Sequence, residues 1–297
     1  MLVGENYSKR FSLGLLTSSG SLGLLFPPSL AVLLYGIVAG VSIEQLFTAG
    51  LVPGTILLVM LAVYATVTSR RVGIARHPFL FAAFVSAAKD GFWDILLPVG
   101  IIAGLLGGYL TVTEAASCSA AYALLLESVI HRRLNTRALY HEIFRETCVL
   151  VGSLLIILGI ALGLTNLMID AQLPMKILAI LEQDVQSQLQ FLLLLNVFLL
   201  AIGCVMDIFS ATMVIVPLIL PLAQRFGVDP VHLGIIFLAN LEIGYLTPPV
   251  GINLFLASQR FREPMLNLFR ASLPFLLIML IWLALVTYLP YLSLWWK

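Results

Sequence analysis

Long apolar segments separated by short polar connections run through the whole chain. Seven of these segments have the pattern of membrane helices: 11–39, 46–69, 92–110, 113–131, 148–169, 231–259 and 266–289. A helix needs about 20 mostly apolar residues to cross a bilayer, whereas a strand of a membrane barrel alternates over about 10 residues. The pattern therefore predicts an all-α polytopic membrane protein.

One further apolar region is divided by a short polar sequence. Residues 187–225 contain two apolar halves on either side of Asp207-Ile-Phe-Ser210. Each half is short for a full crossing. We therefore predict a re-entrant hairpin over 187–225, which enters and leaves the membrane on one side with Asp207 to Ser210 at its tip.

The basic residues support this topology. Lys and Arg collect on the cytoplasmic flanks of membrane helices. With a cytoplasmic N-terminus and a hairpin that does not cross, 13 of the 16 Lys and Arg lie on the cytoplasmic side and 3 on the other. If the hairpin is counted as one crossing, the three arginines of 260–270 move to the outer side of the membrane, and the excess of Lys and Arg on the cytoplasmic side becomes smaller. The C-terminus is then predicted to lie on the outer face.

Two segments mix aromatic and charged residues instead of being uniformly apolar. They are 77–94 and 135–146, both on the predicted cytoplasmic side. Such segments are typical of helices that lie in the membrane interface. Packing against a partner subunit would give the same pattern.

Composition agrees with a membrane location. Hydrophobic residues make up 61% of the chain and charged residues 10%, against about 45–50% and 25% in soluble domains. The net charge of +1 argues against a nucleic-acid partner. Cys118, Cys148 and Cys204 lie in apolar runs without the spacing of a metal site.

Two of the predicted helices carry the same interruption. Gly23-Leu-Leu-Phe-Pro-Pro28 and Gly244-Tyr-Leu-Thr-Pro-Pro249 both follow G-x-L-x-P-P, and the similarity extends into their flanks. The predicted topology runs these helices in opposite directions, which indicates inverted repeats over 1–133 and 134–297. Since only 26 residues precede Pro27, we expect the first repeat to lack the span and hairpin that precede the second.

Each Pro-Pro pair predicts free backbone carbonyl groups at membrane depth. Proline removes an N–H donor and clashes with the carbonyl one turn earlier. A free carbonyl in hydrocarbon is costly unless it is satisfied, and carbonyls at interrupted helices of inverted repeats coordinate Na⁺ in secondary transporters. The alternative is a proline kink that a neighbouring Ser or Thr satisfies.

Four stretches then resemble a known family. They are YSKRFSLGLLTSSGSLGLLFPPS, GGYLTVTEAA, MDIFSATMVIVPLILPLA and NLEIGYLTPPVGINLF. In this order they resemble the large, DctM-like membrane subunit of tripartite ATP-independent periplasmic (TRAP) transporters. The resemblance runs from about residue 5 to the end of the chain.

The resemblance implies a transporter and no enzyme. It implies an elevator-type importer of organic acids, a C4-dicarboxylate or another carboxylate, in the bacterial inner membrane, with the C-terminus in the periplasm. Na⁺ would be the coupling ion, and no cofactor is expected. The implied partners are a small membrane subunit and a periplasmic substrate-binding protein.

The resemblance also implies which residues bind ions and substrate. Sodium would be held by oxygens at the two interruptions and the hairpin: Ser19, Ser21, Gly23, Phe26 and Pro27 at the first, and Gly244, Thr247 and Pro248 with Asp207 and Thr212 at the second. Substrate would lie near Ser29, Ser210 and Asn253.

Three acidic residues of the predicted membrane segments each have two possible roles. Glu114 either has a functional role as an intramembrane carboxylate or begins a helix next to Thr113. Glu242, two residues before Gly244, has either a coupling or a structural role. Asp207 either contacts an ion or substrate or caps the returning half of the hairpin.

Other functions fit the sequence less well. An intramembrane metalloprotease needs H-E-x-x-H, and HEIFR at 141–145 lacks the second histidine. A channel does not require inverted, interrupted helices. Another Na⁺/anion elevator family that works without a binding protein, or a non-functional fragment, remains an alternative.

Overall fold

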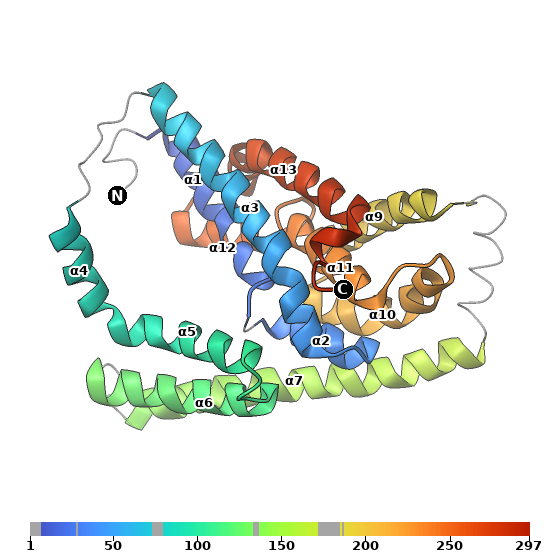
Figure 1. The fold of residues 1–297 in the computed structure, drawn as a ribbon, viewed down its shortest axis with the longest axis horizontal. Helices are drawn as coiled ribbons and strands as arrows, with labels where there is room; N and C mark the ends of the chain where they lie inside the picture. Colours follow the sequence, from blue (N-terminus) through green and yellow to red (C-terminus); the bar gives the residue numbers. More distant parts are fainter. Residues whose placement is uncertain (1–6, 28, 73–79, 133–136, 172–184, 186) are drawn as a thin grey trace. The chain divides into compact units, whose positions relative to one another are not determined.

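The computed structural model describes residues 7–27, 29–72, 80–132, 137–171, 185 and 187–297. Every regular element within these residues is a helix, as Figure 1 shows. The chain forms two compact units, one of residues 1–75 with 161–297 and one of residues 76–160. The all-α prediction is thus confirmed for the part of the chain that the structure describes.

The first unit holds both predicted interruptions and the predicted hairpin. Its elements are α1 (Lys9–Ser19), the 3-10 turn η2 (Leu22–Leu24), α2 (Leu30–Ala39), α3 (Ile43–Val72), α9 (Gln188–Val205), α10 (Ile208–Arg225), α11 (Pro230–Gly244), α12 (Ile252–Phe261), α13 (Met265–Tyr288) and η4 (Pro290–Leu292).

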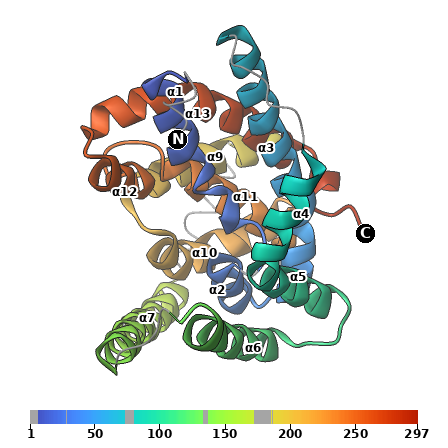
Figure 2. The same cartoon turned by 90° about the vertical axis from the view of Figure 1, so that its left-hand side faces the viewer.

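Helix α11 is the centre of this unit. All its residues from Val231 to Gly244 are buried, and it packs against α2, α3, α9, α10 and α13. The turned view in Figure 2 shows the same central position. A helix that is apolar all round must be enclosed by protein or lipid, so a polar side chain in α11 points into the packed interior.

Helices α9 and α10 form a hairpin with a two-residue connection. Ser187 caps the start of α9, and Met206 and Asp207 join the two helices. At the other end the rings of Phe191 and Phe226 stack with centroids 4.6 Å apart. This stacking shows that the two helices run antiparallel.

The second unit is a smaller helical group. It contains α4 (Phe81–Asp90), α5 (Phe92–Leu106), α6 (Val112–Leu125) and the π-helix η3 (Leu126–Ile130), while α7 (Arg137–Asp170) runs from this unit into the first. Helices α5 and α6 pack together, and the Tyr122 hydroxyl donates to the Trp93 carbonyl oxygen at 2.8 Å.

The structure corrects two of the predicted boundaries. Residues 137–146 do not form a separate interfacial helix, because they continue into the predicted span 148–169 as the single helix α7. The sequence changes polarity near Glu146, but no Gly or Pro interrupts the backbone from Arg137 to Val151. Residues 92–94 belong to α5 and are separated from α4 by Gly91.

Four helices in the described residues have the length and the apolar composition of membrane-spanning helices. They are Ile43–Arg70, Gln188–Val205, Ile208–Arg225 and Met265–Tyr288. Two of them are the arms of the hairpin, each 18 residues long. Their length is compatible with crossing as well as with re-entry, so the re-entrant hairpin stays a prediction. The repeat boundary at residue 133 also stays a prediction, because the compact units follow packing and not symmetry.

Candidate functional site

The second interruption separates α11 from α12. Helix α11 ends at Gly244 and α12 begins at Ile252, with Pro248 and Pro249 between them. Part of the backbone between the helices is satisfied locally, since the Asn253 N–H donates to the Tyr245 carbonyl oxygen at 3.1 Å. The Thr247 hydroxyl donates to the Ile243 carbonyl oxygen, also at 3.1 Å.

The hairpin docks onto this interruption through two glycines. A Cβ atom at Gly244 would lie 2.4 Å from the carbonyl carbon of Gly203. The backbones of α9 and α11 can therefore approach only because both positions lack a side chain. Close by, the Val250 N–H donates to the Cys204 carbonyl oxygen at 3.1 Å, which joins the end of α9 to the interrupted segment.

Tyr245 joins the tip of the hairpin to the second interruption through a hydrogen bond. Its phenol oxygen accepts a hydrogen bond from the Ile208 N–H at 2.7 Å. This N–H is one of the groups at the start of α10 that have no partner within the helix. This contact could not be predicted from the sequence, because the two residues lie 37 positions apart.

Asp207 caps α10. One carboxylate oxygen, Oδ1, accepts from the N–H groups of Phe209 and Ser210, each at 3.0 Å. The Thr212 hydroxyl donates to the Ile208 carbonyl oxygen at 2.5 Å and is buried. Of the predicted sodium residues, the structure thus brings Asp207, Gly244 and Thr247 to the docked hairpin tip, while the Thr212 hydroxyl is engaged within its own helix.

The first interruption separates α1 from α2. Helix α1 ends at Ser19, α2 begins at Leu30, and Ser29 caps α2 by accepting from the Val32 N–H at 3.4 Å. A Cβ atom at Gly50 of α3 would lie 2.5 Å from the Leu25 carbonyl oxygen. The interrupted segment therefore packs with its backbone directly on α3.

The other predicted sodium residues of the first interruption differ in exposure. Ser21 and Pro27 are buried, Ser19 and Phe26 are half-buried, and Gly23 is exposed. The Ser21 hydroxyl donates to the Ser18 carbonyl oxygen at 3.0 Å. Pro28 lies outside the described residues.

Glu242 lies in α11, two residues before the helix ends at Gly244. Its side chain is fully buried, and neither carboxyl oxygen has a hydrogen-bond partner in the described residues. The hydroxyl of Ser21 is close to this carboxyl group, although it donates to the Ser18 carbonyl instead. Because η2 packs against α11, Glu242 connects the first interruption to the helix that carries the second.

The predicted substrate residues have separate surroundings. Asn253 at the start of α12 has a buried side-chain nitrogen without a partner in the described residues. Ser29 caps α2, and Ser210 lies in the first turn of α10. No hydrogen bond joins any two of these three described side chains.

A cavity of about 280 Å³ adjoins the second interruption. Its polar lining consists of Thr247 and Cys204, and the remaining lining is apolar: Leu200, Ile243, Phe269, Leu273, Leu276, Leu277 and Leu280. Such a lining offers little to an anion. We therefore do not place the substrate in this cavity.

Glu114 has a structural role in the described fold. It forms a capping box with Thr111 at the start of α6, where its carboxylate accepts from the Thr111 N–H and hydroxyl, both at 2.8 Å. Of its two predicted roles, the geometry fits that of a residue that begins a helix.

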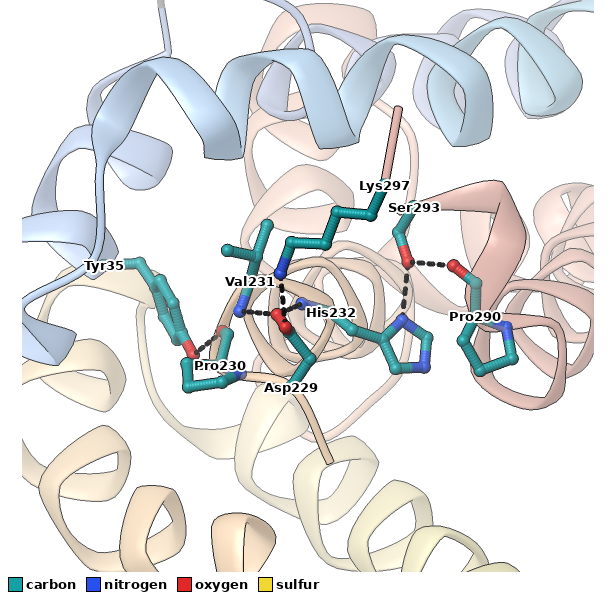
Figure 3. Close-up of polar contacts among 8 residues, drawn as sticks. All are labelled: Tyr35, Asp229, Pro230, Val231, His232, Pro290, Ser293 and Lys297. Carbon is teal, nitrogen blue, oxygen red and sulfur yellow. Dashed lines mark hydrogen bonds and ion pairs between the residues drawn. The ribbon is translucent and has the colours of Figure 1, made fainter. Parts of the chain in front are cut away.

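A polar cluster fixes the start of α11, as Figure 3 shows. Asp229 caps the helix through the Val231 N–H at 2.8 Å and forms an ion pair with Lys297 at 2.5 Å. Partial burial alone raises the pKa of Asp229, but the hydrogen bond and charge of Lys297 and the backbone N–H groups outweigh it, so the pKa is lower than usual. The Tyr35 hydroxyl donates to the Pro230 carbonyl oxygen at 2.8 Å.

His232, in the first turn of α11, makes two contacts through its ring. Its Nδ1 lies 2.6 Å from the Ser293 hydroxyl and its Nε2 lies 3.2 Å from the Thr287 carbonyl oxygen (Figure 3 draws the first contact). A second buried contact, between Asn240 and Asn196 at 2.7 Å, joins α11 to α9. Sequence reasoning missed both, since a lone polar residue in an apolar run does not show its partner.

Within the described residues no three or more His, Cys, Asp or Glu side chains form a group that could hold a metal ion. The acceptors at the two interruptions are carboxylate, hydroxyl and carbonyl oxygens. These are ligands for hard cations.

The comparisons with known proteins agree with one another. The family model described as "Tripartite ATP-independent periplasmic transporter, DctM component" matches residues 1–292. The C4-dicarboxylate TRAP transporter large permease protein DctM of Vibrio cholerae is 33% identical over 314 residues, which cover 99% of this chain and 69% of the relative.

Two further relatives have other substrates in their names. The ectoine TRAP transporter large permease protein TeaC of Halomonas elongata is 31% identical, over 99% of this chain and 69% of the relative. The sialic acid TRAP transporter large permease protein SiaM of Vibrio cholerae is 34% identical, over 96% of this chain and 66% of the relative.

Proposed function

Because this chain belongs to the family of DctM components of tripartite ATP-independent periplasmic transporters, we propose that it carries a carboxylate through the bacterial inner membrane together with Na⁺. The chain is a multi-pass membrane protein and a transporter subunit, not an enzyme. Its proposed partners are a small membrane subunit and a periplasmic protein that delivers the substrate.

The observation that carries this proposal is the meeting of three helix ends in one unit. The hairpin tip at Asp207 docks onto the interruption after Gly244, and the first interruption packs against the same α11. Interrupted helices present unpaired carbonyls and oriented dipoles at membrane depth. This arrangement supports an ion and substrate site built from two inverted repeats that moves by an elevator mechanism.

The proposed sodium ligands at the second interruption are backbone oxygens at Gly244 and Pro248, with Asp207 and Thr247 beside them. The Gly244 carbonyl oxygen accepts from the Thr247 N–H at 2.9 Å, and its second lone pair is the one that we assign to the ion. Asp207 uses Oδ1 to cap α10, so Oδ2 is the oxygen that we assign to the ion. Thr212 is a further candidate: its hydroxyl donates its hydrogen to the Ile208 carbonyl, as that of Thr247 does to Ile243, and the oxygen of each can still accept a cation.

The proposed substrate is a small carboxylate, with a C4-dicarboxylate as the first candidate. The Vibrio cholerae DctM relative is named for that class. A carboxylate needs hydrogen-bond donors, and the buried side-chain nitrogen of Asn253 lacks an acceptor in the described residues. We assign it to the substrate, with the hydroxyls of Ser29 and Ser210 as further donors.

Uptake into vesicles tests the proposal. The chain is reconstituted with its proposed small membrane subunit and its proposed binding protein, and uptake of labelled succinate is measured with and without an inward Na⁺ gradient. We expect uptake only when all three proteins and Na⁺ are present. Uptake that does not require the binding protein would favour the alternative, a Na⁺/anion transporter that works without one.

The charge of Asp207 can be tested with a matched pair of variants. Asp207→Asn keeps an oxygen that can cap α10 but removes the negative charge, and we expect at least about a tenfold loss of Na⁺-dependent uptake. Asp229→Asn makes the same change at the cap of α11, away from the hairpin tip, and should keep uptake near the wild-type level. Wild-type sodium dependence in Asp207→Asn would contradict the assignment.

A further inference from the structure

An open cavity of about 370 Å³ lies where α1 meets the start of α13, and we call it the basic recess. Helices α1 and α13 pack against each other, and Figure 2 shows them side by side. Three basic side chains and one acidic side chain share the recess. Its lining residues are Lys9, Arg10, Leu13, Glu263, Asn267, Arg270 and Ala271.

The charges of the basic recess are not balanced. Lys9 forms an ion pair with Glu263, and the hydrogen bond from Lys9 lowers the pKa of Glu263, so this pair is neutral as a whole. The Arg10 guanidinium donates to the Arg270 carbonyl oxygen at 3.0 Å, which holds its charge beside α13. Because Glu263 is the only acidic side chain in the described lining, the charges of Arg10 and Arg270 have no counter-charge in the recess.

The predicted topology places the basic recess at the cytoplasmic surface of the membrane. Lys9, Arg10 and Arg270 are among the basic residues on which this topology depends. The cytoplasmic leaflet carries anionic lipids, and basic pockets between membrane helices bind their headgroups. In the part of the chain that the structure describes, no side chain caps the start of α13, and the positive end of a helix dipole favours an anion. A lipid phosphate therefore fits the charge and the position of the recess.

Arg270 lies at the polar end of an exposed apolar stripe on α13. Leu273 and Leu277 follow three and seven residues later on the same face of the helix, and they are 39% and 62% exposed. Both line the apolar cavity of about 280 Å³ that adjoins the second interruption. With a rise of about 1.5 Å per residue, Leu277 lies about 10 Å further along the helix than Arg270. A ligand that occupies both places has an anionic head and an apolar tail, which a free phosphate lacks.

We propose that an anionic phospholipid binds along the start of α13, with its phosphate at Arg10 and Arg270 and one acyl chain in the apolar cavity over Leu273 and Leu277. The acyl chain fills space between α9, α11 and α13 that would otherwise cost packing contacts. It thereby stabilises the packing beside the docked hairpin. Binding at this site depends neither on Na⁺ nor on the transported solute.

The test measures lipid binding through the thermal stability of the purified full chain, in a neutral detergent at constant ionic strength. Three probes are compared: dioctanoyl phosphatidylglycerol, dioctanoyl phosphatidylcholine with the same tails and no net charge, and glycerol phosphate, which has no tails. A ligand that binds only the folded protein raises its unfolding temperature. We expect a saturable rise with phosphatidylglycerol and none with the other two probes over the same concentration range.

The headgroup assignment is tested with Arg270→Gln, which removes one positive charge from the recess. The phosphatidylglycerol concentration for half-maximal stabilisation should rise about fivefold, because one Lys or Arg near the surface contributes about this factor to the attraction of anionic lipids. Arg260→Gln is the matched control, since Arg260 is an exposed arginine of α12 outside the described lining, and it should leave the response unchanged. Glu263→Gln removes the acidic side chain and should lower the concentration that is needed.

The position of the acyl chain is tested with Leu277→Asn, which places an amide group in the apolar cavity. We expect the phosphatidylglycerol concentration for half-maximal stabilisation to rise several-fold, because the acyl chain then contacts a polar group. Leu58→Asn makes the same change at an exposed leucine of α3 outside the cavity lining and should leave the response unchanged. Equal responses in these two variants would overturn the proposed position of the chain.

Other occupants of the site would give different results. An equal response to phosphatidylglycerol and phosphatidylcholine, or a wild-type response in Arg270→Gln, would overturn the headgroup assignment. A response to glycerol phosphate as large as that to phosphatidylglycerol would identify a free anion and also overturn it. Loss of the lipid response when the small membrane subunit is added would assign this face to the subunit. No response to any probe would overturn the site and leave the transport proposal standing.

Discussion

At the residue scale, the ion pair of Asp229 with Lys297 shows how one carboxylate fixes the start of the central helix. Asp229 accepts from two backbone N–H groups and from Lys297. Each of these contacts favours the charged carboxylate. The start of α11 should therefore depend on pH through this residue.

The charge of Asp229 can be isolated with Asp229→Asn, which keeps the capping oxygen. Because the folded state lowers the pKa of this carboxyl group, its contribution is fully present above the unfolded value of 3.8 and is lost as the pH falls through the lower folded value. We expect a cost of about 0.3–1 kcal/mol at pH 7. The unfolding temperatures of both proteins, followed from pH 7 to pH 3, should converge at the acid end; a constant difference would contradict this explanation.

Tyr245 provides a second test at the scale of one atom. Tyr245→Phe removes the oxygen that accepts from the Ile208 N–H and leaves this buried donor unpaired, which costs about 1–3 kcal/mol. We expect a lower unfolding temperature and faster amide hydrogen exchange at Ile208. Tyr291→Phe, at an exposed tyrosine, should change neither, and equal exchange in the two variants would exclude the proposed contact.

Some of these residues could be predicted and others could not. Asp207 and Asp229 stand directly before helices, where a carboxylate can cap the N–H groups of the next turn, so local sequence was sufficient. The partners of Tyr245 and His232 come from distant segments. A pattern along one chain contains no information on which distant group will fill such a position.

At the element scale, the docking of the hairpin depends on the absence of side chains. Gly203 and Gly244 place α9 and α11 in backbone contact. The predicted span 231–259 is occupied by two helices, α11 (Pro230–Gly244) and α12 (Ile252–Phe261), on either side of Pro248 and Pro249. The continuity of α7 was missed, because a change of polarity does not end a helix when no Gly or Pro breaks its backbone.

Gly244→Ala tests the docking directly. The added Cβ atom would lie within 2.8 Å of three Gly203 backbone atoms, so the hairpin must separate from α11 or the backbone must shift. We expect a destabilisation of about 1–3 kcal/mol or more and a loss of uptake. Gly100→Ala in α5 is the control, because nothing lies within 4 Å of its added Cβ, and it should stabilise slightly. A similar small effect of both substitutions would contradict the docking.

At the scale of the whole molecule, the predicted topology places the N-terminus in the cytoplasm and the C-terminus in the periplasm. The distribution of Lys and Arg carries this prediction. A fusion of alkaline phosphatase after Lys297 should be active in cells, and a fusion of green fluorescent protein at the same position should be dark. The reverse result would place the C-terminus in the cytoplasm and contradict the predicted topology.

In the proposed mechanism, the two interrupted helices and the hairpin tip together couple solute movement to Na⁺. The most direct measurement is the accumulation of labelled succinate in vesicles that contain the complete transporter, under a Na⁺ gradient of adjustable size. We predict that the internal concentration exceeds the external one only with an inward Na⁺ gradient and falls to equality when the gradient is abolished. Accumulation of the same extent without a Na⁺ gradient would contradict the account.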